Sequence, residues 1–288
     1  GMSMSSAMKS VLSIAGSDSS GGAGIQADLK TIESFHLYGQ TAITSLTAQN
    51  TTGVYVVFDA SPEFVAQQID VVFDDIVPDA VKVGMVSNAG IVSAIAHSLV
   101  RNQARNIVVD PVMVATSGAS LSSDSALSRL VSELMPLADV VTPNIPEAEV
   151  LCGFPIRTEA DQERAAFALV GIRGCEPGEG AAIRFANGRF PRAVLVKGGH
   201  GKNDANDVLV DGSGCVTWFR ASRVDTSNTH GTGCTLSSAI ACGLASGLSL
   251  EDSIRQAKTY ISGALSDGLD LGRGSGPMNH MWANKLLI

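Results

Sequence analysis

Short, continuous hydrophobic runs alternate along this chain with longer segments in which hydrophobic residues recur every three or four positions. The short runs are typical of strands buried on both faces, and the longer segments are typical of amphipathic helices that cover a sheet. Strands are predicted over residues 11–15, 41–48, 80–83, 106–109, 139–141 and 193–196. Helices are predicted over residues 25–35, 64–73, 89–101, 124–135, 236–250 and 250–265. This repeated alternation predicts an α/β fold with a mainly parallel central sheet.

Three segments fit the pattern less clearly. Residues 54–60 are expected to form either an antiparallel flap or an edge strand. Residues 174–190 are rich in glycine and polar residues, and we expect a surface loop or small hairpin there without an assigned function. Residues 1–9 are expected to be a disordered N-terminal segment that starts with a tag scar, Gly1-Met2. Residues 10–288 contain no internal repeat and no clear linker, so they are expected to form one domain.

The composition narrows the classes of partner. The 288 residues are 45% hydrophobic, which is enough for a large core, and the formal net charge is −8. This acidic balance argues against nucleic acid as the main partner. No hydrophobic run reaches the roughly 18 residues that a membrane-spanning helix needs, so no membrane partner is expected. Five cysteines without a CxxC pair, and no secretory hydrophobic region, favour a reducing, cytoplasmic location over a disulfide framework.

Polar or glycine-rich segments directly follow five of the predicted strands. They are Gly16-Ser17-Asp18, Gly84-Met85, Asp110-Pro111, Pro143-Asn144 and Lys197-Gly198-Gly199. In open parallel sheets, ligands bind at the carboxyl ends of the strands. We therefore expect these five segments to meet at one rim of the sheet and to form a site there.

The sequence Gly231-Thr232-Gly233-Cys234, just before the hydrophobic helix, carries the strongest chemical signal. It places backbone N–H groups at a helix start, where the helix dipole favours negative charge. We expect Cys234 to have a lowered thiol pKa there and to act as a base or nucleophile. An anion site beside a proton acceptor suits phosphoryl transfer to an alcohol. The structural alternative is an ordinary glycine-containing helix start with Cys234 packed inside.

The glycine-rich segment 16–24 allows three interpretations. Residues 22–27 formally match a dinucleotide-binding fingerprint, which would make the protein a nicotinamide-dependent oxidoreductase. The long loop after the strand and the missing acidic residue about 20 positions later weigh against this function. A flexible loop without a function is the second alternative. We favour the third, a loop that lets a substrate approach the backbone closely.

Four further polar residues have both a structural and a functional explanation. Asn144 and Glu147 suit a helix start around Pro146 or a Mg²⁺ site bound through water, and the spacing favours neither. Lys197 is either a solvated turn residue or a point charge for a polyphosphate. Gln49, at the end of a hydrophobic strand, could hydrogen-bond a flat heterocycle. The sequence has no GxxxxGK[ST], protein-kinase motif set or HExxH spacing, which disfavours P-loop, protein-kinase and zinc sites.

Taken together, these motifs resemble the ribokinase-like superfamily and, more narrowly, the hydroxymethylpyrimidine/phosphomethylpyrimidine kinases of thiamine biosynthesis. The resemblance extends from residue 11 to about residue 282, through residues 15–31, 47–51, 83–85, 110–113, 142–149, 197–200 and 228–235. It implies a three-layer α/β/α sandwich with a mainly parallel sheet, and it implies ATP and Mg²⁺ as cosubstrates. It also implies two successive phosphorylations, first of 4-amino-5-hydroxymethyl-2-methylpyrimidine and then of its monophosphate.

The same resemblance implies roles for individual residues. The pyrimidine pocket would comprise Gln49, Asp28, Gly16, Ala23, Met85 and Val112. The ATP phosphates would meet Lys197, Thr229 and the turn at 231–234, and the catalytic group would be Gly231, Thr232, Gly233, Cys234 and Lys197. Asp110, Asn144 and Glu147 would hold the metal ion and its waters.

The resemblance leaves the exact acceptor and the oligomeric state open. Cys234 stands where most ribokinase-like sugar kinases have aspartate, which favours an aromatic heterocycle over a sugar as the acceptor. Pyridoxal kinase has the same fold and can have the same cysteine, so it is the alternative enzyme. Members of the superfamily often dimerise, so a homodimer is an open alternative to a monomer.

Residues 174–190 depart from the family pattern because they are longer than the compact turn expected there.

Overall fold

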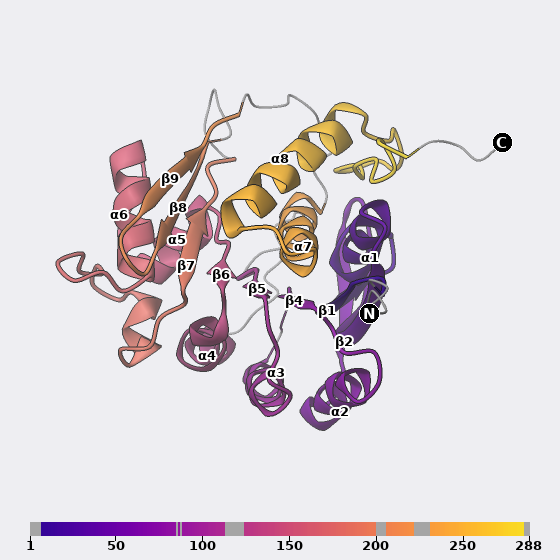
Figure 1. Cartoon of the computed structure of the whole chain (residues 1–288), viewed down its shortest axis with the longest axis horizontal. Coiled ribbons are helices and arrows are strands. Elements are labelled where there is room, and N and C mark those ends of the chain that lie inside the picture. The colour runs from indigo at the N-terminus through magenta and orange to yellow at the C-terminus, as the bar shows by residue number, and fades with distance from the viewer. Residues whose placement is uncertain are drawn as a thin grey trace, which may run out of the picture.

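The central feature of the fold is a sheet with hydrophobic residues on both faces. The computed structural model describes residues 7–84, 86, 88–112, 124–199, 206–221 and 231–284. The strands are β1 (Ser10–Asp18), β2 (Tyr38–Asn50), β3 (Gly53–Asp59), β4 (Ala80–Val83), β5 (Ile107–Val109), β6 (Val140–Val141), β7 (Ala193–Val196), β8 (Asp207–Asp211) and β9 (Val216–Phe219). Across the described residues they form one nine-stranded sheet in the order β3-β2-β1-β4-β5-β6-β7-β8-β9 (Figure 1).

The middle of this sheet is parallel and its margins are antiparallel. Strand β1 pairs in parallel with β2 and β4, and parallel pairing continues through β5 and β6 to β7. The β2–β3, β7–β8 and β8–β9 pairs are antiparallel. The prediction of a mainly parallel sheet is therefore confirmed, and the segment at 54–60 forms the antiparallel edge strand β3. Strands β8 and β9 were not predicted from the sequence.

Helices cover both faces of the sheet. One layer contains α1 (Gly24–Ser34), α7 (Thr232–Ala245) and α8 (Leu250–Ser266) (Figure 1). The other contains α2 (Pro62–Phe73), α3 (Ala89–Arg101), α4 (Asp124–Arg129), α5 (Ile145–Cys152) and α6 (Glu159–Leu169). Successive residues of β1 point to opposite faces of the sheet. Val11 packs in the hydrophobic core under the first helix layer, and Leu12 and Ile14 pack in the core under the second. This confirms the predicted three-layer α/β/α sandwich.

Local sequence signals explain several helix boundaries. Ser61 accepts a hydrogen bond from the Phe64 N–H and so caps α2, and Asn88 caps α3 in the same way. The predicted helix over 124–135 is instead divided. It begins as α4, changes to a π-helix over Leu130–Leu134 and ends as a 3-10 turn at Met135–Leu137. Pro136 in that last turn cannot donate a backbone hydrogen bond, so a regular helix cannot continue through it.

The glycine-rich segment 174–190 forms a loop that contains a short 3-10 helix, Ala182–Ala186. Gly178 N–H donates a hydrogen bond of 2.7 Å to the Cys152 carbonyl, which attaches the loop to the end of α5. All five cysteines are free. Among the described residues, no helix combines the length and hydrophobicity needed to cross a membrane.

Candidate active site

The carboxyl ends of β1, β4, β5, β6 and β7 lie at the same edge of the sheet because these strands are parallel. Each of these ends carries a residue or segment predicted for the site. Strand β1 extends to Asp18, further than predicted, so Gly16 lies within the strand at a register shift. A Cβ on Gly24, the first residue of α1, would overlap the Gly16 carbonyl, so the glycines allow the chain to turn tightly here.

The start of α7 packs directly against the glycine-rich loop that follows β1. Gly231 is the N-cap of α7 and has a left-handed backbone with φ of 81°. A Cβ at this position would overlap the carbonyl oxygen of Gly22. Two glycine segments more than 200 positions apart in the sequence thus form one continuous backbone surface at the end of the sheet.

Asp18 fixes the shape of this glycine loop, a role that the sequence analysis missed although it placed Asp18 in the polar segment after the first strand. Its Oδ2 accepts hydrogen bonds from the N–H groups of Gly22, at 3.1 Å, and Ala23, at 2.8 Å. Its Oδ1 accepts from Ser20 N–H at 2.8 Å. An aspartate at the start of a Ser-Ser-Gly-Gly segment is a known turn signal, so the sequence did contain a clue. These hydrogen bonds give the loop a defined conformation, which disfavours the flexible-loop alternative.

Lys197, Asp110 and Gly233 meet at the centre of the site. Lys197 Nζ lies 3.9 Å from Asp110 Oδ1, and its side chain is only 12% exposed. A Cβ on Gly233 would lie 3.4 Å from Lys197 Nζ and 3.5 Å from Asp110 Oδ2. Burial alone would lower the pKa of Lys197, but attraction to the surrounding groups, first Asp110 and then Glu147, Asp207 and Cys234, together raises this pKa. Lys197 is therefore a fixed positive charge beside the first turn of α7.

Asn144 and Glu147 lie next to Lys197 and also cap a helix. Asn144 Oδ1 accepts from Glu147 N–H at 2.8 Å, and Glu147 Oε1 accepts from Asn144 N–H at 3.0 Å. This reciprocal capping box starts α5. Lys197 N–H donates to the Pro143 carbonyl at 2.9 Å, which joins the ends of β6 and β7. The structural explanation of the two residues therefore holds, and their position near Lys197 keeps the metal-binding function open.

The oxygen donors at this edge have the chemistry that Mg²⁺ prefers. Asp110 is 3% exposed and Glu147 is 7% exposed, and both carboxylates act on Lys197. Within the described residues, no three His, Cys, Asp or Glu side chains form a ready-made metal cluster. Magnesium commonly keeps several waters and uses one or two carboxylates together with substrate phosphates. Asp110, Asn144 and Glu147 therefore fit a magnesium ion held largely through water and nucleotide.

Cys234 lies in the first turn of α7, as predicted, but the direction of its pKa shift was predicted wrongly. Burial raises the pKa of the thiol, and Asp28 and Asp110 raise it further, while Lys82 and a hydrogen bond with the Gly24 backbone oppose the rise. The sequence revealed the helix start, which lowers a thiol pKa, but not the burial or the two carboxylates. At neutral pH this sulfur is therefore mainly a thiol.

Asp28 lies within α1 and is buried, so it is not at the surface of the glycine loop. It is 0% exposed, and its carboxylate accepts hydrogen bonds from Ser13 Oγ, at 2.5 Å, and Lys82 Nζ, at 2.9 Å. Burial raises its pKa, with Lys82 and Ser13 opposing the rise. Lys82 is a second residue that the sequence analysis missed, although a lysine within a hydrophobic strand is an unusual signal.

Gln49 lies beside the same loop. Its N–H donates to Ser19 Oγ at 2.8 Å, and that hydroxyl donates to the Gln49 carbonyl at 2.6 Å. Its side-chain oxygen accepts from Thr47 Oγ1 at 3.0 Å. The end of β2 is thereby attached to the glycine loop, with the Gln49 and Ala23 side chains half-buried. Met85 and Thr229, which were also predicted for the site, lie outside the described residues.

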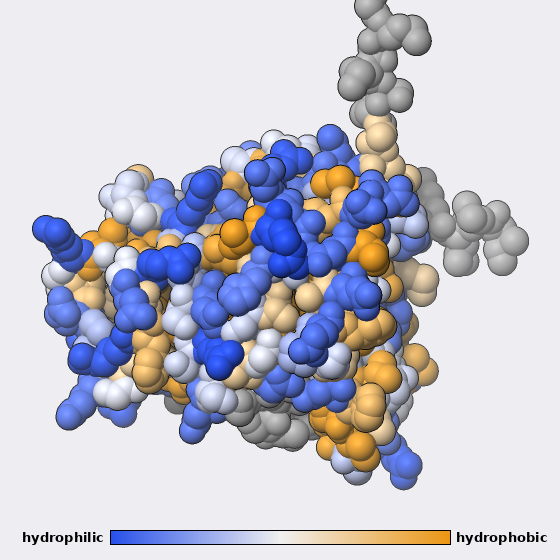
Figure 2. All heavy atoms as spheres, turned by 90° about the horizontal axis from the view of Figure 1, so that it is seen from below, coloured by the Kyte–Doolittle hydropathy of each residue, from blue (hydrophilic) through white to orange (hydrophobic). Residues whose placement is uncertain are grey.

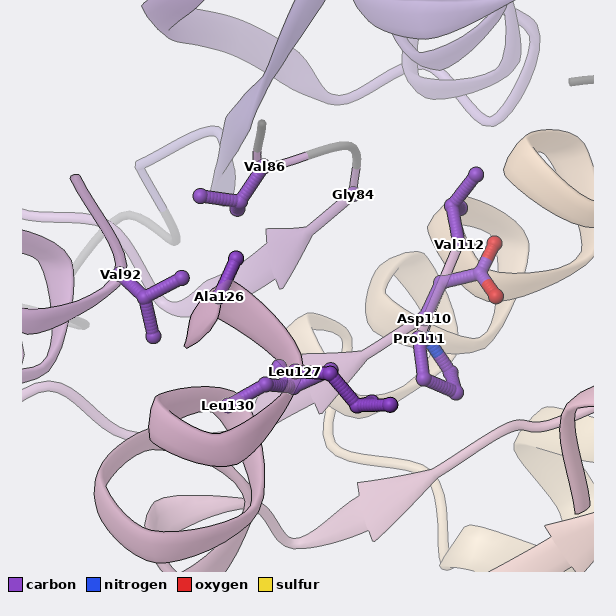
Figure 3. Close-up of a pocket in the computed structure, with 9 residues that line it drawn as sticks. All are labelled: Gly84, Val86, Val92, Asp110, Pro111, Val112, Ala126, Leu127 and Leu130. Atoms are coloured by element: carbon purple, nitrogen blue, oxygen red, sulfur yellow. The ribbon is translucent and has the colours of Figure 1, made fainter. Parts of the chain in front are cut away.

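A small, mostly hydrophobic pocket lies between the ends of β4 and β5 and helix α4 (Figure 3). It is lined by Gly84, Val86, Val92, Asp110, Pro111, Val112, Ala126, Leu127 and Leu130. The Asp110 carboxylate and the Val112 side chain point to the same side, away from Leu127 and Leu130 (Figure 3). A residue predicted for metal binding and one predicted for the heterocycle thus border the same cavity.

This arrangement defines a class of enzyme. A mainly parallel sheet covered on both faces, with a glycine-lined helix start and a buried lysine at its carboxyl edge, is the framework of a ribokinase-like phosphotransferase. A family model described as phosphomethylpyrimidine kinase matches residues 18–279. The chain therefore belongs to the phosphomethylpyrimidine kinase family and is a phosphotransferase.

Named relatives agree with this assignment. The hydroxymethylpyrimidine/phosphomethylpyrimidine kinase of Rhizobium meliloti is 49% identical, with coverage of 93% of this chain and 96% of the relative. The crystal structure of phosphomethylpyrimidine kinase from Clostridium difficile is 40% identical with a TM-score of 0.73, covering 88% of this chain and 98% of that one. The ADP complex of Bacillus subtilis pyridoxal kinase is 33% identical with a TM-score of 0.81, covering 96% and 98% of the two chains.

Proposed function

We propose that this protein uses ATP to phosphorylate 4-amino-5-hydroxymethyl-2-methylpyrimidine and then its monophosphate, which supplies the pyrimidine diphosphate for thiamine biosynthesis. The observation that carries the proposal is the convergence of Gly233, Lys197 and Asp110, within the family to which the chain belongs. A nicotinamide-dependent oxidoreductase is disfavoured because this edge brings together a cation and an anion-binding turn suited to a transferring phosphoryl group.

The first turn of α7 would hold the transferring phosphoryl group. The N–H groups at a helix start have no carbonyl partner within the helix, and they point toward an anion placed there. Gly231 and Gly233 keep side chains away from this surface, so phosphate oxygens can approach the backbone. Lys197 adds a positive charge beside the same turn. Positioning and charge stabilisation supply most of the catalysis in phosphoryl transfer.

Asp110, Asn144 and Glu147 would hold Mg²⁺, mainly through water. When bound, the ion offsets negative charge on the ATP phosphates. The two buried carboxylates would position the water shell, and their attraction to Lys197 keeps the ammonium charged and oriented toward the same phosphates. Asn144 and Glu147 are already fixed by the α5 capping box, so little ordering is needed on binding.

Cys234 would act as the general base in the first phosphorylation. In that step the thiolate form of the sulfur takes the hydroxymethyl proton, the oxygen forms a bond to the γ-phosphorus, and the bond between that phosphorus and ADP breaks. Because the thiol pKa is raised, the rate of this step should increase with pH above neutrality. The acceptor in the second step is a phosphate that is already ionised, so it depends less on a base.

The glycine loop and the end of β2 would bind the heterocycle. Ala23 and Val112 provide apolar contact, Gly16 leaves space, and Gln49 offers an amide for hydrogen bonding. Asp28 is fully buried, so it would influence the heterocycle pocket without contacting the ligand. Similarity to a pyridoxal kinase favours pyridoxal as a second candidate acceptor, because both molecules are flat nitrogen heterocycles with a hydroxymethyl group.

Mass spectrometry of the products tests the proposed function. The protein is incubated with Mg-ATP and either the hydroxymethylpyrimidine or pyridoxal, and samples are taken over time. We expect the pyrimidine monophosphate to appear first and the diphosphate to follow, with pyridoxal phosphorylated more slowly. Phosphorylation of pyridoxal alone, or the absence of a pyrimidine diphosphate, would contradict the proposal.

We also propose that this enzyme is cytoplasmic. Five free cysteines are compatible with a reducing compartment.

We further propose that the enzyme is a homodimer. Edge strand β3 exposes Tyr55, Val56 and Phe58, and hydrophobic residues gather on the side of α2 and β2 (Figure 2). An exposed hydrophobic edge strand is a surface for association. Light scattering of the wild type and Phe58→Lys should give dimer and monomer masses; a monomeric wild type would contradict this state.

A further inference from the structure

A buried carboxylate holds the chain next to Lys197. Asp207, the first residue of β8, is 3% exposed, and its Oδ1 accepts a hydrogen bond of 2.9 Å from Gly198 N–H. Its Oδ2 accepts a second, of 2.8 Å, from Lys258 Nζ of α8. A buried aspartate needs such partners, because removing a carboxylate from water carries a large energetic penalty. The phosphate-binding role proposed above for Lys197 gives this aspartate no function of its own.

The strand register explains why Asp207 lies at this place. Strands β7 and β8 are antiparallel, and they pair as far as Val196 with Val208. One step further along both strands, Lys197 and Asp207 are the next residues to face each other. At that step the Asp207 side chain takes up the Gly198 N–H. The carboxylate therefore continues the contact between the two strands beyond the last regular pair.

Two more hydrogen bonds fix the same stretch of backbone. Lys197 N–H donates to the Pro143 carbonyl at 2.9 Å, and Gln162 Nε2 of α6 donates to the Val196 carbonyl at 3.0 Å. Helices α6 and α8 cover opposite faces of the β7–β8 pair (Figure 1). Side chains from both helix layers therefore hold the backbone from which the Lys197 side chain extends.

The place of the Lys197 ammonium group depends on this backbone. The ammonium lies 3.9 Å from Asp110 Oδ1 and beside Gly233, in the centre of the proposed phosphate site. A side chain that reaches a reacting group from the end of a strand moves with the backbone at its base. A displacement of about 1 Å, caused by a change away from the chemistry, can lower a rate about 10²-fold.

We propose that Asp207, anchored by Lys258, is a positioning residue that fixes the backbone at Gly198 and so aims the Lys197 ammonium at the transferring phosphoryl group. The inference rests on the proposed function in giving Lys197 that target. Asp207 acts only through Lys197 and contacts neither substrate nor nucleotide. A residue that merely stabilised the fold would affect turnover equally whether Lys197 were present or not.

Two double variants separate the hydrogen bond from the charge. Asp207→Asn/Lys258→Met removes both charges and keeps an amide oxygen that accepts from Gly198 N–H. Asp207→Leu/Lys258→Met removes both charges and the acceptor, while leucine fills about the same space. Neither variant leaves a buried charge unpaired. Urea unfolding measures stability, and ADP release gives kcat and KM with the hydroxymethylpyrimidine and, in parallel, with pyridoxal.

The leucine version should lose kcat about tenfold or more, with the KM for the heterocycle within about twofold of wild type. The asparagine version should keep kcat within about threefold of wild type. In a Lys197→Met background the leucine version should cause no further loss of kcat, because the group that Asp207 positions is already absent. An equal loss in both versions, or a further loss in the Lys197→Met background, would overturn the inference.

Asp139 and Arg192 offer a matched control at the opposite edge of the sheet. Asp139 Oδ2 accepts from Ile107 N–H, at the start of β5, at 2.7 Å, and its Oδ1 lies 3.6 Å from the Arg192 guanidinium. Asp139→Leu/Arg192→Met should lower stability and leave kcat near the wild-type value. A comparable loss of kcat in this control would overturn the inference, since general destabilisation would then explain the effect. Should the leucine version at 207 not fold, Asp207→Ala/Lys258→Met removes the same groups.

The single variant Lys197→Met separates this inference from the proposed function. A loss of kcat in Lys197→Met with full kcat in the leucine version leaves the phosphate role standing and removes Asp207 as a positioning residue. Normal kcat in Lys197→Met contradicts the phosphate role and this inference with it. Turnover of pyridoxal alone contradicts the proposed acceptor, whereas the expected pattern of kcat values with pyridoxal still supports the role of Asp207.

Discussion

The backbone of Gly231 lies against the carbonyl oxygen of Gly22 so closely that no Cβ fits between them. This contact joins the start of α7 to the loop after β1, and it aligns the proposed phosphate site with the proposed heterocycle pocket. Because Gly231 also has a positive φ, both its conformation and its surroundings require glycine. The relative position of donor and acceptor sites therefore depends on two glycines.

Gly231→Ala should impair both stability and catalysis. Strain at positive φ and overlap with Gly22 should destabilise the protein by about 1–3 kcal/mol and displace the turn. We expect kcat/KM to fall about 100-fold. Gly247→Ala is a matched control, because Gly247 has φ of 87° and a Cβ there would meet no other atom within 4 Å. Urea unfolding and steady-state kinetics should show strain alone in the control; equal activity loss in both variants would contradict this role.

Lys197→Met should slow phosphoryl transfer while the fold remains intact. Removing a positioned cation from the transferring group typically lowers kcat about 10²–10³-fold. Circular dichroism and ADP release report fold and activity. Arg192→Met removes the same charge from an exposed ion pair and should retain wild-type kcat. Normal turnover in Lys197→Met would mean that the lysine does not meet the phosphates.

Gln49→Ala should weaken binding of the pyrimidine and leave ATP binding unchanged. Loss of a hydrogen bond to the heterocycle should raise the KM for the pyrimidine roughly tenfold. Gln40→Ala is a control on the same strand, where the side chain instead bonds the Ile76 carbonyl. Titrations of each substrate at saturating concentration of the other give the two KM values. A larger effect on ATP would remove Gln49 from the heterocycle pocket.

Buried His280 should make stability depend on pH. Its ring pairs with Thr235 at 2.9 Å, and burial lowers its pKa from 6.5 to about 4. The unfolded chain therefore binds a proton more readily between these values. Stability should be full above about pH 6.5 and decrease toward pH 4, by on the order of 3 kcal/mol from this group.

Chemical unfolding at pH 7.5 and 5.0 measures this effect. His280→Asn should lose less stability than the wild type over that range, while exposed His97→Asn should follow the wild type. Equal pH dependence in all three proteins would show that His280 does not bind its proton differently on folding.

Sequence periodicity predicted the middle of the sheet well, because β4, β5 and β7 are buried on both faces and read as hydrophobic runs. It missed β8 and β9. Their hydrophobic stretches are short and lie next to polar residues, and the two strands pair antiparallel with their neighbours. It also missed α6, since the alanines facing the core give a weak helical pattern.

The positions of site residues were predictable where those residues directly follow a strand. The ionisation and pairing of buried side chains were less predictable. Lys197 and Asp110 meet as expected because the parallel strands β7 and β5 end at the same edge of the sheet, and the first turn of α7 brings Gly233 beside them. The raised pKa of Cys234 and the pairing of Lys82 with Asp28 depend on contacts between elements far apart in the sequence. No local sequence pattern shows such long-range contacts. The sequence analysis therefore predicted a lowered pKa for Cys234, which is wrong, and overlooked Lys82.

A cysteine within the same helix provides the control for the central claim. Cys242 is 1% exposed, lies two turns after Cys234 and has no contact with the proposed phosphate turn among those described. Cys242→Ala removes a sulfur from the core of α7, so it should lower stability and leave both phosphorylation rates near the wild-type values.

The most direct measurement compares the rates of the first and second phosphorylations in Cys234→Ala by rapid quench and mass spectrometry. If the turn around Gly233 holds the phosphoryl group while the neighbouring sulfur accepts the hydroxymethyl proton, the first rate should fall about 10²–10⁴-fold and the second much less. An equal loss in both steps, or no loss in the first, would contradict the assignment of Cys234 as the base.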